Sequence, residues 1–141
     1  MTAITAAEYE ERLVSLCIGG SRGIPKKVRD RHVLLMAASN SFERGMIYNQ
    51  KEVDTAIKVW LDRGCPSLKI DEVTIRRELI DASYLMRDDA GRFYAVGPGP
   101  AMISYADDVA MVDPIRTIER ALQERAARKQ DRPGSGMESR S

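Results

Sequence analysis

Basic side chains are densest between residues 26 and 31, where Lys26, Lys27, Arg29 and Arg31 lie close together. Such side chains hold phosphate groups electrostatically and do not distinguish one base from another. A solvated helix face has the same composition, so the segment admits both interpretations. Lys26, Lys27 and Arg29 are therefore candidate contacts to nucleic acid, provided that their charges share one surface.

A second candidate set lies on the segment from Asp71 to about Ser83, where the apolar spacing predicts a helix. Thr74 and Arg77 project from its polar side, and an arginine in that position can donate two hydrogen bonds to guanine. Glu78 and Asp81 share this side and would repel phosphate. The same helix thus carries candidate base contacts and the strongest sequence argument against tight DNA binding.

Two other polar residues fall on apolar helix faces, where a structural role explains them better. We expect the stem of Arg76 to pack and its guanidinium to pair with a carboxylate or carbonyl, because an unpaired buried charge is costly. His32 is expected to be a hydrogen-bonded core residue. A metal site would need further ligands, and neither Cys17 nor Cys65 supplies one at a workable spacing. We predict no metal.

No recognisable framework of nucleophile, base and orienting group is found in the sequence. The Asp88-Asp89 and Asp107-Asp108 pairs suit turns and linkers, where aspartate bonds the following backbone. The glycines from Gly19 to Gly23 lack the spacing and the Lys-Ser/Thr ending of a phosphate-binding loop, and indicate a hinge. We therefore predict a protein that is not an enzyme and takes no cofactor.

The elements that must position these residues are clearest from Asn49 onward. Asn49 is followed three residues later by Glu52, which is an asparagine version of the capping box. Apolar residues then recur at helical spacing: Val53, Ala56, Ile57, Trp60 and Leu61. Trp60 is expected in the core. Gly64, Cys65 and Pro66 end this helix, and Asp71 can cap the next one.

Two β-capable runs follow, over residues 84–87 and 92–96, joined by Asp88-Asp89-Ala90-Gly91. The order helix, turn, helix, hairpin is typical of a winged helix-turn-helix domain, in which the second helix can lie in a DNA groove. Arg92 on the hairpin, or wing, is a further candidate DNA contact. The predicted fold class is mainly α with a small β-hairpin, with extra helices at both termini.

Three more helices are predicted around this centre. Thr5 and Glu8 form a capping box for the first, and Pro25 can occupy the first turn of the second, which stops by Asn40. Asp113-Pro114 begins the last, along which Ile115, Ile118 and Leu122 form an apolar stripe. The predicted organisation is an N-terminal helix and glycine joint (1–22), a winged-helix-like domain (23–97), a linker and C-terminal helix (98–129) and a disordered tail (130–141).

The composition fits one cored domain, with 141 residues of which 43% are hydrophobic. Lys+Arg 22 and Asp+Glu 21 nearly balance, so affinity for nucleic acid must come from local clustering. The N-terminal residues lack the layout of a signal peptide, and no apolar run reaches the roughly 20 residues that cross a bilayer. We expect a cytoplasmic protein with no membrane partner.

With these elements in place, the segment from about Gly23 to Val96 resembles the bacterial domain-of-unknown-function family 2087. The resemblance rests on an ordered series of short motifs: Ile24-Pro25-Lys26-Lys27, Phe42-Glu43-Arg44-Gly45-Met46-Ile47-Tyr48, Glu52-Val53, Thr74-Ile75-Arg76-Arg77-Glu78-Leu79-Ile80 and Gly91-Arg92-Phe93-Tyr94. It covers roughly half of the chain, and the series is more specific than any single motif.

Members of that family occur in bacterial proteins that include transcriptional regulators, so the resemblance implies a regulatory association but transfers no catalytic or ligand residues. The chain departs from the family pattern in carrying Ala82-Ser83 where a glycine commonly precedes the first hairpin strand. We also expect no separate N-terminal DNA-binding domain. A chain of this kind can be an accessory module of a regulator.

Taken together, the sequence favours a DNA-binding or transcription-regulatory protein that uses a winged-helix-like domain. The alternative is a non-enzymatic protein-interaction or dimerisation module, in which the apolar stripe of Ile115, Ile118 and Leu122 pairs with a symmetry mate or another chain. The near-neutral charge and the acids on the helix after Asp71 favour this alternative.

Overall fold

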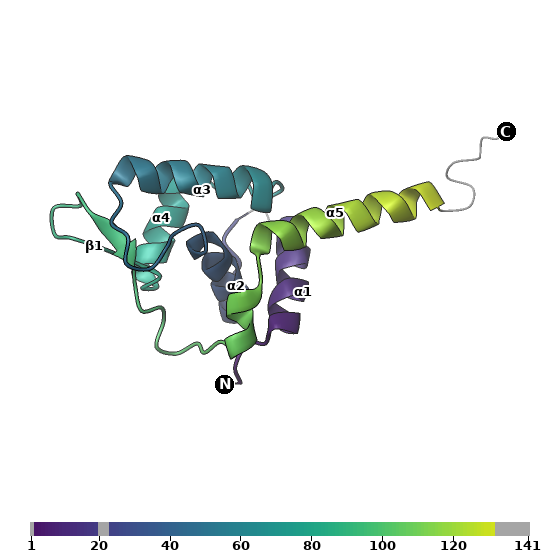
Figure 1. The fold of residues 1–141 in the computed structure, drawn as a ribbon, viewed down its shortest axis with the longest axis horizontal. Coiled ribbons are helices and arrows are strands. Elements are labelled where there is room, and N and C mark those ends of the chain that lie inside the picture. Colours follow the sequence, from purple (N-terminus) through teal and green to yellow (C-terminus); the bar gives the residue numbers. More distant parts are fainter. Residues whose placement is uncertain (1, 20–22, 132–141) are drawn as a thin grey trace.

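Helices dominate the structure, a computed structural model that describes residues 2–19 and 23–131 (Figure 1). In chain order, its elements are α1 (Ala6–Cys17), α2 (Val28–Ser39), α3 (Gln50–Gly64), α4 (Glu72–Asp81), β1 (Leu85–Arg87), β2 (Tyr94–Val96), the 3-10 helix η1 (Asp107–Met111) and α5 (Pro114–Asp131). The two strands form an antiparallel hairpin. The predicted fold class, mainly α with a small β-hairpin, is confirmed.

Local capping signals fix where α3 and α4 begin. The Asn49 side chain accepts a hydrogen bond from the Glu52 N–H at 2.8 Å, and the Glu52 carboxylate accepts one from the Asn49 N–H at 2.8 Å. These two bonds complete the predicted capping box. The Asp71 carboxylate caps α4 by accepting from the Thr74 N–H at 2.9 Å. Both helices therefore begin where the sequence predicted.

Helix α1 forms only half of its predicted capping box. The Thr5 hydroxyl accepts from the Glu8 N–H at 3.1 Å, as expected. The Glu8 carboxylate, however, accepts two hydrogen bonds from the guanidinium of Arg29 on α2, at 2.6 and 2.8 Å. Arg12 on α1 binds Asp30 on α2 in the same forked manner, with both bonds at 2.9 Å. The two arginine–carboxylate forks fasten α1 to α2.

Helix α2 begins later than predicted. Its first residue is Val28 and its N-cap is Lys27, so Pro25 lies outside the helix and not in its first turn. The Arg31 side chain donates to the carbonyl oxygens of Pro25 at 3.3 Å and Lys26 at 3.2 Å. These contacts hold the preceding segment as a loop against the helix. Residues 20–22 of the predicted glycine joint lie outside the described residues.

A single hydrophobic cluster joins the terminal elements to the centre of the chain. Its largest fully buried side chains are Trp60, Tyr9, Tyr94, Ile4, Leu13, Leu34, Leu35, Ile57, Ile75, Leu79, Leu85 and Ile118. Trp60 is 2% exposed, which confirms its predicted place in the core. The N-terminal segment also reaches the linker, since Ile4 and Tyr105 form a parallel β-bridge. Helix α1 and the base of α5 lie side by side (Figure 1).

The hairpin gains a third strand-like segment from the residue before α3. Tyr48 and Tyr94 exchange backbone hydrogen bonds, at 2.8 Å from the Tyr48 N–H and 2.7 Å from the Tyr94 N–H. In the hairpin itself Arg87 lies opposite Tyr94. Gly91 in the connecting turn has φ +70, the left-handed conformation for which the sequence analysis assigned it. The small sheet is thereby held against the helical body.

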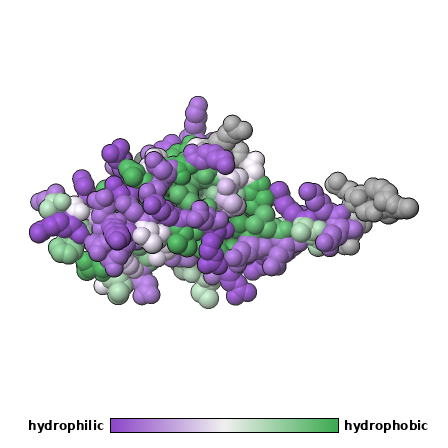
Figure 2. All heavy atoms as spheres, turned by 90° about the horizontal axis from the view of Figure 1, so that it is seen from above, coloured by the Kyte–Doolittle hydropathy of each residue, from purple (hydrophilic) through white to green (hydrophobic). Residues whose placement is uncertain are grey.

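The stripe on α5 is used within the chain. Ile118 is fully buried and Ile115 packs against the core, whereas Leu122 is 41% exposed. The stripe therefore cannot serve as a whole in pairing with a second chain, which corrects that expectation. Beyond its base α5 projects from the body (Figure 1), and hydrophobic atoms gather where it joins the body, while its outer part is mostly hydrophilic (Figure 2).

Helix α5 also extends to Asp131, past the predicted boundary at residue 129. Its outer turns carry long side chains with good helix propensity and so continue without core contacts. Residues 132–141 of the predicted tail lie outside the described residues. No helix in the described part of the chain combines the length and the apolar character that crossing a lipid bilayer requires.

Candidate nucleic-acid interface

The basic segment before and within α2 divides between exposed and engaged side chains. Lys26 and Lys27 are exposed in the loop that precedes the helix. Arg29 is engaged, because its guanidinium binds the Glu8 carboxylate and donates to the Thr2 carbonyl oxygen at 2.8 Å. The hydrogen bond from Arg29 lowers the pKa of Glu8 and keeps this carboxylate charged. Arg29 therefore fastens two helices, whereas Lys26 and Lys27 are the exposed candidates of this segment.

Arg76 has the structural role that its position predicts. Its guanidinium forms a hydrogen bond and salt bridge with Asp54 on α3, and the side chains are 14% and 22% exposed. The pair joins α3 to α4 beside a second, more exposed pair between Lys58 and Glu72 at 3.4 Å. Because Arg76 lies close to the surface, its charge still contributes to the field on that side of α4.

Three arginines converge on one cavity between α4 and the hairpin. The cavity has a volume of about 320 Å³ and is lined by Arg76, Arg77, Ile80, Asp81 and Arg87. Arg77 and Arg87 are exposed, and no salt bridge to either is found among the described residues. Guanidinium groups in such an arrangement suit the bidentate binding of phosphate oxygens. Asp81 is the one acid in the lining.

Thr74 takes part in the cap of α4 through its backbone. Its N–H donates to the Asp71 carboxylate at 2.9 Å, and this bond is the main cause of the lowered pKa of Asp71. The charge of Arg77 lowers this pKa further. Thr74 is exposed, one turn before Arg77 on the same helix. It lies at the N-terminal end of α4, away from the arginine cavity lining.

Arg92 lies at the hairpin turn and not in the arginine cavity. Its guanidinium is 3.9 Å from the Asp88 carboxylate and lies over the ring of Phe93, 5.7 Å from the ring centre. The Asp88 carboxylate accepts from the N–H groups of Arg92 at 2.7 Å and Phe93 at 3.1 Å. The bond from Phe93 is the main cause of the lowered pKa of Asp88. This network orders the tip of the hairpin.

The structure therefore brings Arg77 together with Arg76 and Arg87. Of these, Arg87 was not among the candidate residues of the sequence analysis. The alternation of residues in a strand predicts which face each side chain lies on, but not which helix packs against that face. The position of Arg87 beside α4 could therefore not be predicted. Lys26, Lys27 and Arg92 do not line the arginine cavity. Within residues 2–19 and 23–131, the predicted contacts are thus spread over three surfaces, and the one that includes Arg77 forms a cavity with several cations.

Comparison with known proteins gives one match. A family model described as "Uncharacterized protein conserved in bacteria (DUF2087)" matches residues 22–96 of this chain. No curated protein matches the chain, and no solved structure matches it. The matched segment includes α2, α3, α4 and the hairpin, and therefore every arginine of the cavity.

Proposed function

The chain belongs to the DUF2087 family of uncharacterised bacterial proteins, and from this premise we propose that it is a non-enzymatic DNA-binding protein involved in transcriptional regulation. In this proposal α3 and α4 act as a helix-turn-helix and the hairpin acts as the wing. The observation that carries the proposal is the arginine cavity between α4 and β1. A phosphate at the edge of a DNA groove would meet cations from the helix and from the wing at once.

The balance of charge in this cavity supports phosphate binding. Asp54 pairs with Arg76 and weakens its field, and Asp81, unpaired among the described residues, adds a second negative charge to the site. One net positive charge is left among Arg76, Arg77, Arg87 and these two acids. Phosphate contacts of this kind position a protein on DNA, whereas sequence is read by side chains that reach base edges. Thr74 and Arg77 on the exposed side of α4 are the candidates for that second role.

A salt-titrated binding assay on fluorescent duplexes of bacterial genomic DNA tests the proposal. We expect binding at about 50 mM salt that weakens steeply as salt is added, because phosphate neutralisation releases counterions. The double variant Arg77→Gln/Arg87→Gln should bind more weakly, and its slope of log affinity against log salt should be smaller in magnitude by about 2.

The matched control is Arg125→Gln/Arg128→Gln, which removes the same charge from exposed positions on the outer part of α5. It should leave the salt slope unchanged. The proposal fails if the wild-type protein does not bind at low salt, or if the two double variants lose affinity equally. In the second case the binding would reflect only net charge.

A second candidate function, a protein-interaction module, is favoured by the outward side of the small sheet. Ile47 is 62% exposed, Met86 52% and Phe93 51%, and all three lie on or beside the hairpin. Exposed apolar side chains that cluster in this way are typical of contact surfaces. Light scattering over a range of protein concentrations would distinguish this function. This function would be favoured if the molar mass of the wild-type protein rises with concentration. The Phe93→Ser variant should then keep the mass of a monomer.

A further inference from the structure

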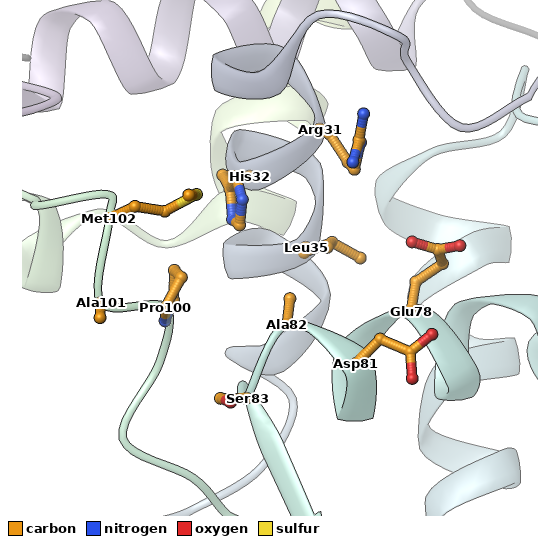
Figure 3. Close-up of a pocket in the computed structure, with 10 residues that line it drawn as sticks. All are labelled: Arg31, His32, Leu35, Glu78, Asp81, Ala82, Ser83, Pro100, Ala101 and Met102. Carbon is orange, nitrogen blue, oxygen red and sulfur yellow. The ribbon is translucent and has the colours of Figure 1, made fainter.

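A larger cavity lies on the other side of Asp81, between α2, the end of α4 and the segment after the hairpin (Figure 3). Its volume is about 430 Å³, which is in the range of small-molecule sites. Apolar groups of Leu35, Ala82, Pro100 and Met102 form much of the lining, and the Met102 side chain points toward the His32 ring (Figure 3). The polar part of the lining decides which ligand it suits.

A chain of hydrogen bonds fixes the proton of His32. The Tyr105 hydroxyl is 2.9 Å from the His32 carbonyl oxygen, whereas the Tyr84 hydroxyl is 3.4 Å from it. We therefore assign Tyr105 as the donor to this oxygen, and Tyr84 as the donor to the Tyr105 hydroxyl, 2.5 Å away, because this arrangement satisfies every contact of the chain. The Tyr84 hydroxyl in turn accepts from Nδ1 of His32 at 2.9 Å. Burial raises the pKa of Tyr105 to about 12, so the phenol keeps the proton that it donates. In this arrangement Nδ1 carries the imidazole proton.

The other ring nitrogen of His32 is consequently a hydrogen-bond acceptor. His32 is 6% exposed and lines the cavity, and the described residues offer no partner to Nε2. An acceptor that lines a cavity is normally paired with water or with a ligand. This nitrogen is therefore a polar contact that the fold itself leaves unused.

Two carboxylates, those of Glu78 and Asp81, face the same cavity from successive turns of α4. Neither forms a hydrogen bond or salt bridge with another described residue. Arg31 also lines the cavity, but the carbonyl oxygens of Pro25 and Lys26 hold its guanidinium. The described residues hold no group of three acidic, histidine or cysteine side chains able to bind a metal ion.

We propose that this cavity binds a small primary amine in its protonated form, with a short aliphatic chain. An ammonium group has three N–H donors, and the carboxylates of Glu78 and Asp81 can accept two of them at one end of the cavity, whereas His32 lies beside Met102 at the other end (Figure 3). The aliphatic chain would lie on Leu35, Pro100 and Met102. The site needs no nucleic acid, so its test is independent of the proposed DNA binding.

Isothermal titration of the full chain with n-pentylamine, in the absence of DNA, tests the proposal. We expect binding of one amine per chain, and at least tenfold weaker binding of 1-pentanol, which has the same chain without the charge. Pentanoate, with the opposite charge, should not bind. The double variant Glu78→Gln/Asp81→Asn should lose about tenfold or more in affinity for the amine.

The control Asp89→Asn/Glu124→Gln removes the same charge from exposed positions elsewhere, and should bind the amine as the wild type does. Chemical-shift mapping on the wild-type protein provides a measurement that does not depend on variants, and the shifts should centre on Glu78, Ala82 and Met102. Equal affinity for pentanol and pentylamine, unchanged affinity in Glu78→Gln/Asp81→Asn, or shifts centred elsewhere would each overturn the proposal.

Discussion

At the scale of single residues, Ser83 is the point where the backbone departs most from what its side chain favours. It is the one non-glycine residue of the described chain with positive φ, at 68°. The Tyr84 N–H bonds the Leu79 carbonyl at 2.9 Å and the Ser83 N–H bonds the Ile80 carbonyl at 3.0 Å. This is the Schellman pattern of helix termination, whose left-handed position is usually glycine.

Ser83→Gly should therefore stabilise the protein by roughly 0.5–1 kcal/mol. Relief of the left-handed conformation contributes about 1–2 kcal/mol, and the greater freedom of glycine in the unfolded chain subtracts about 0.4–1 kcal/mol. Urea unfolding measures the difference. Ser104→Gly is the matched control, since Ser104 is exposed and does not have positive φ, and it should be neutral or destabilising. A loss of stability in Ser83→Gly would contradict the argument.

At the scale of elements, α5 consists of two parts that differ in what holds them. Its base packs through Ile118 and Ile115, and Arg63 on α3 binds Glu119 at 3.1 Å. From Leu122 onward, every described residue whose burial is defined is exposed, and Leu122 itself is 41% exposed. Exposed charged pairs contribute little to stability, so the outer part of this helix depends on its own propensity.

A chain that ends at Ala121 should accordingly unfold in urea with a free energy within about 1 kcal/mol of the full chain, while its helical circular dichroism falls. Ile118→Ala provides the contrast, because deleting this buried side chain should cost about 2–5 kcal/mol. If the truncated chain loses as much stability as Ile118→Ala, the outer part of α5 must contact the body.

The same elements show which features could be predicted from the sequence. The starts of α3 and α4 depend on contacts within three residues of Asn49 and Asp71, and they were predicted. The start of α2 was not predicted, and neither was the ion pair between Arg29 and Glu8. This pair forms only when α1 packs against α2. Arg87 was missed for the same reason, since its cavity exists only where β1 meets α4. Local bonds follow from spacing, whereas partners distant in sequence require the fold.

At the scale of the whole molecule, the stability of the fold should depend on pH through the one histidine of the chain. Burial first, and then the charge of Arg31, lower the pKa of His32 from its ordinary value of 6.5. Between the lowered pKa and 6.5 the unfolded chain binds more protons than the folded one. The contribution of His32 to stability is therefore fully present above its pKa in the unfolded chain. It is lost as the pH falls toward its lower pKa in the folded chain.

We expect the free energy of unfolding to decrease as the pH falls from about 7 to about 5, and to depend much less on pH in His32→Gln. The carboxylates with lowered pKa, on Glu8, Asp71 and Asp88, have ordinary values of 4.5, 3.8 and 3.8, so they act mainly below this window. Urea unfolding of both proteins at several pH values measures the slope. Equal slopes in the two proteins would exclude His32 as the source.

Asp81 lines both the arginine cavity and the cavity beside His32. A cation bound on one side of this carboxylate would offset the charge that opposes an anion on the other side, and the anion would in turn favour the cation. Thermodynamic reciprocity requires the two occupants to raise each other's affinity by the same factor. If both proposed occupants bind, this shared side chain predicts that an amine and a DNA phosphate bind cooperatively across one turn of α4.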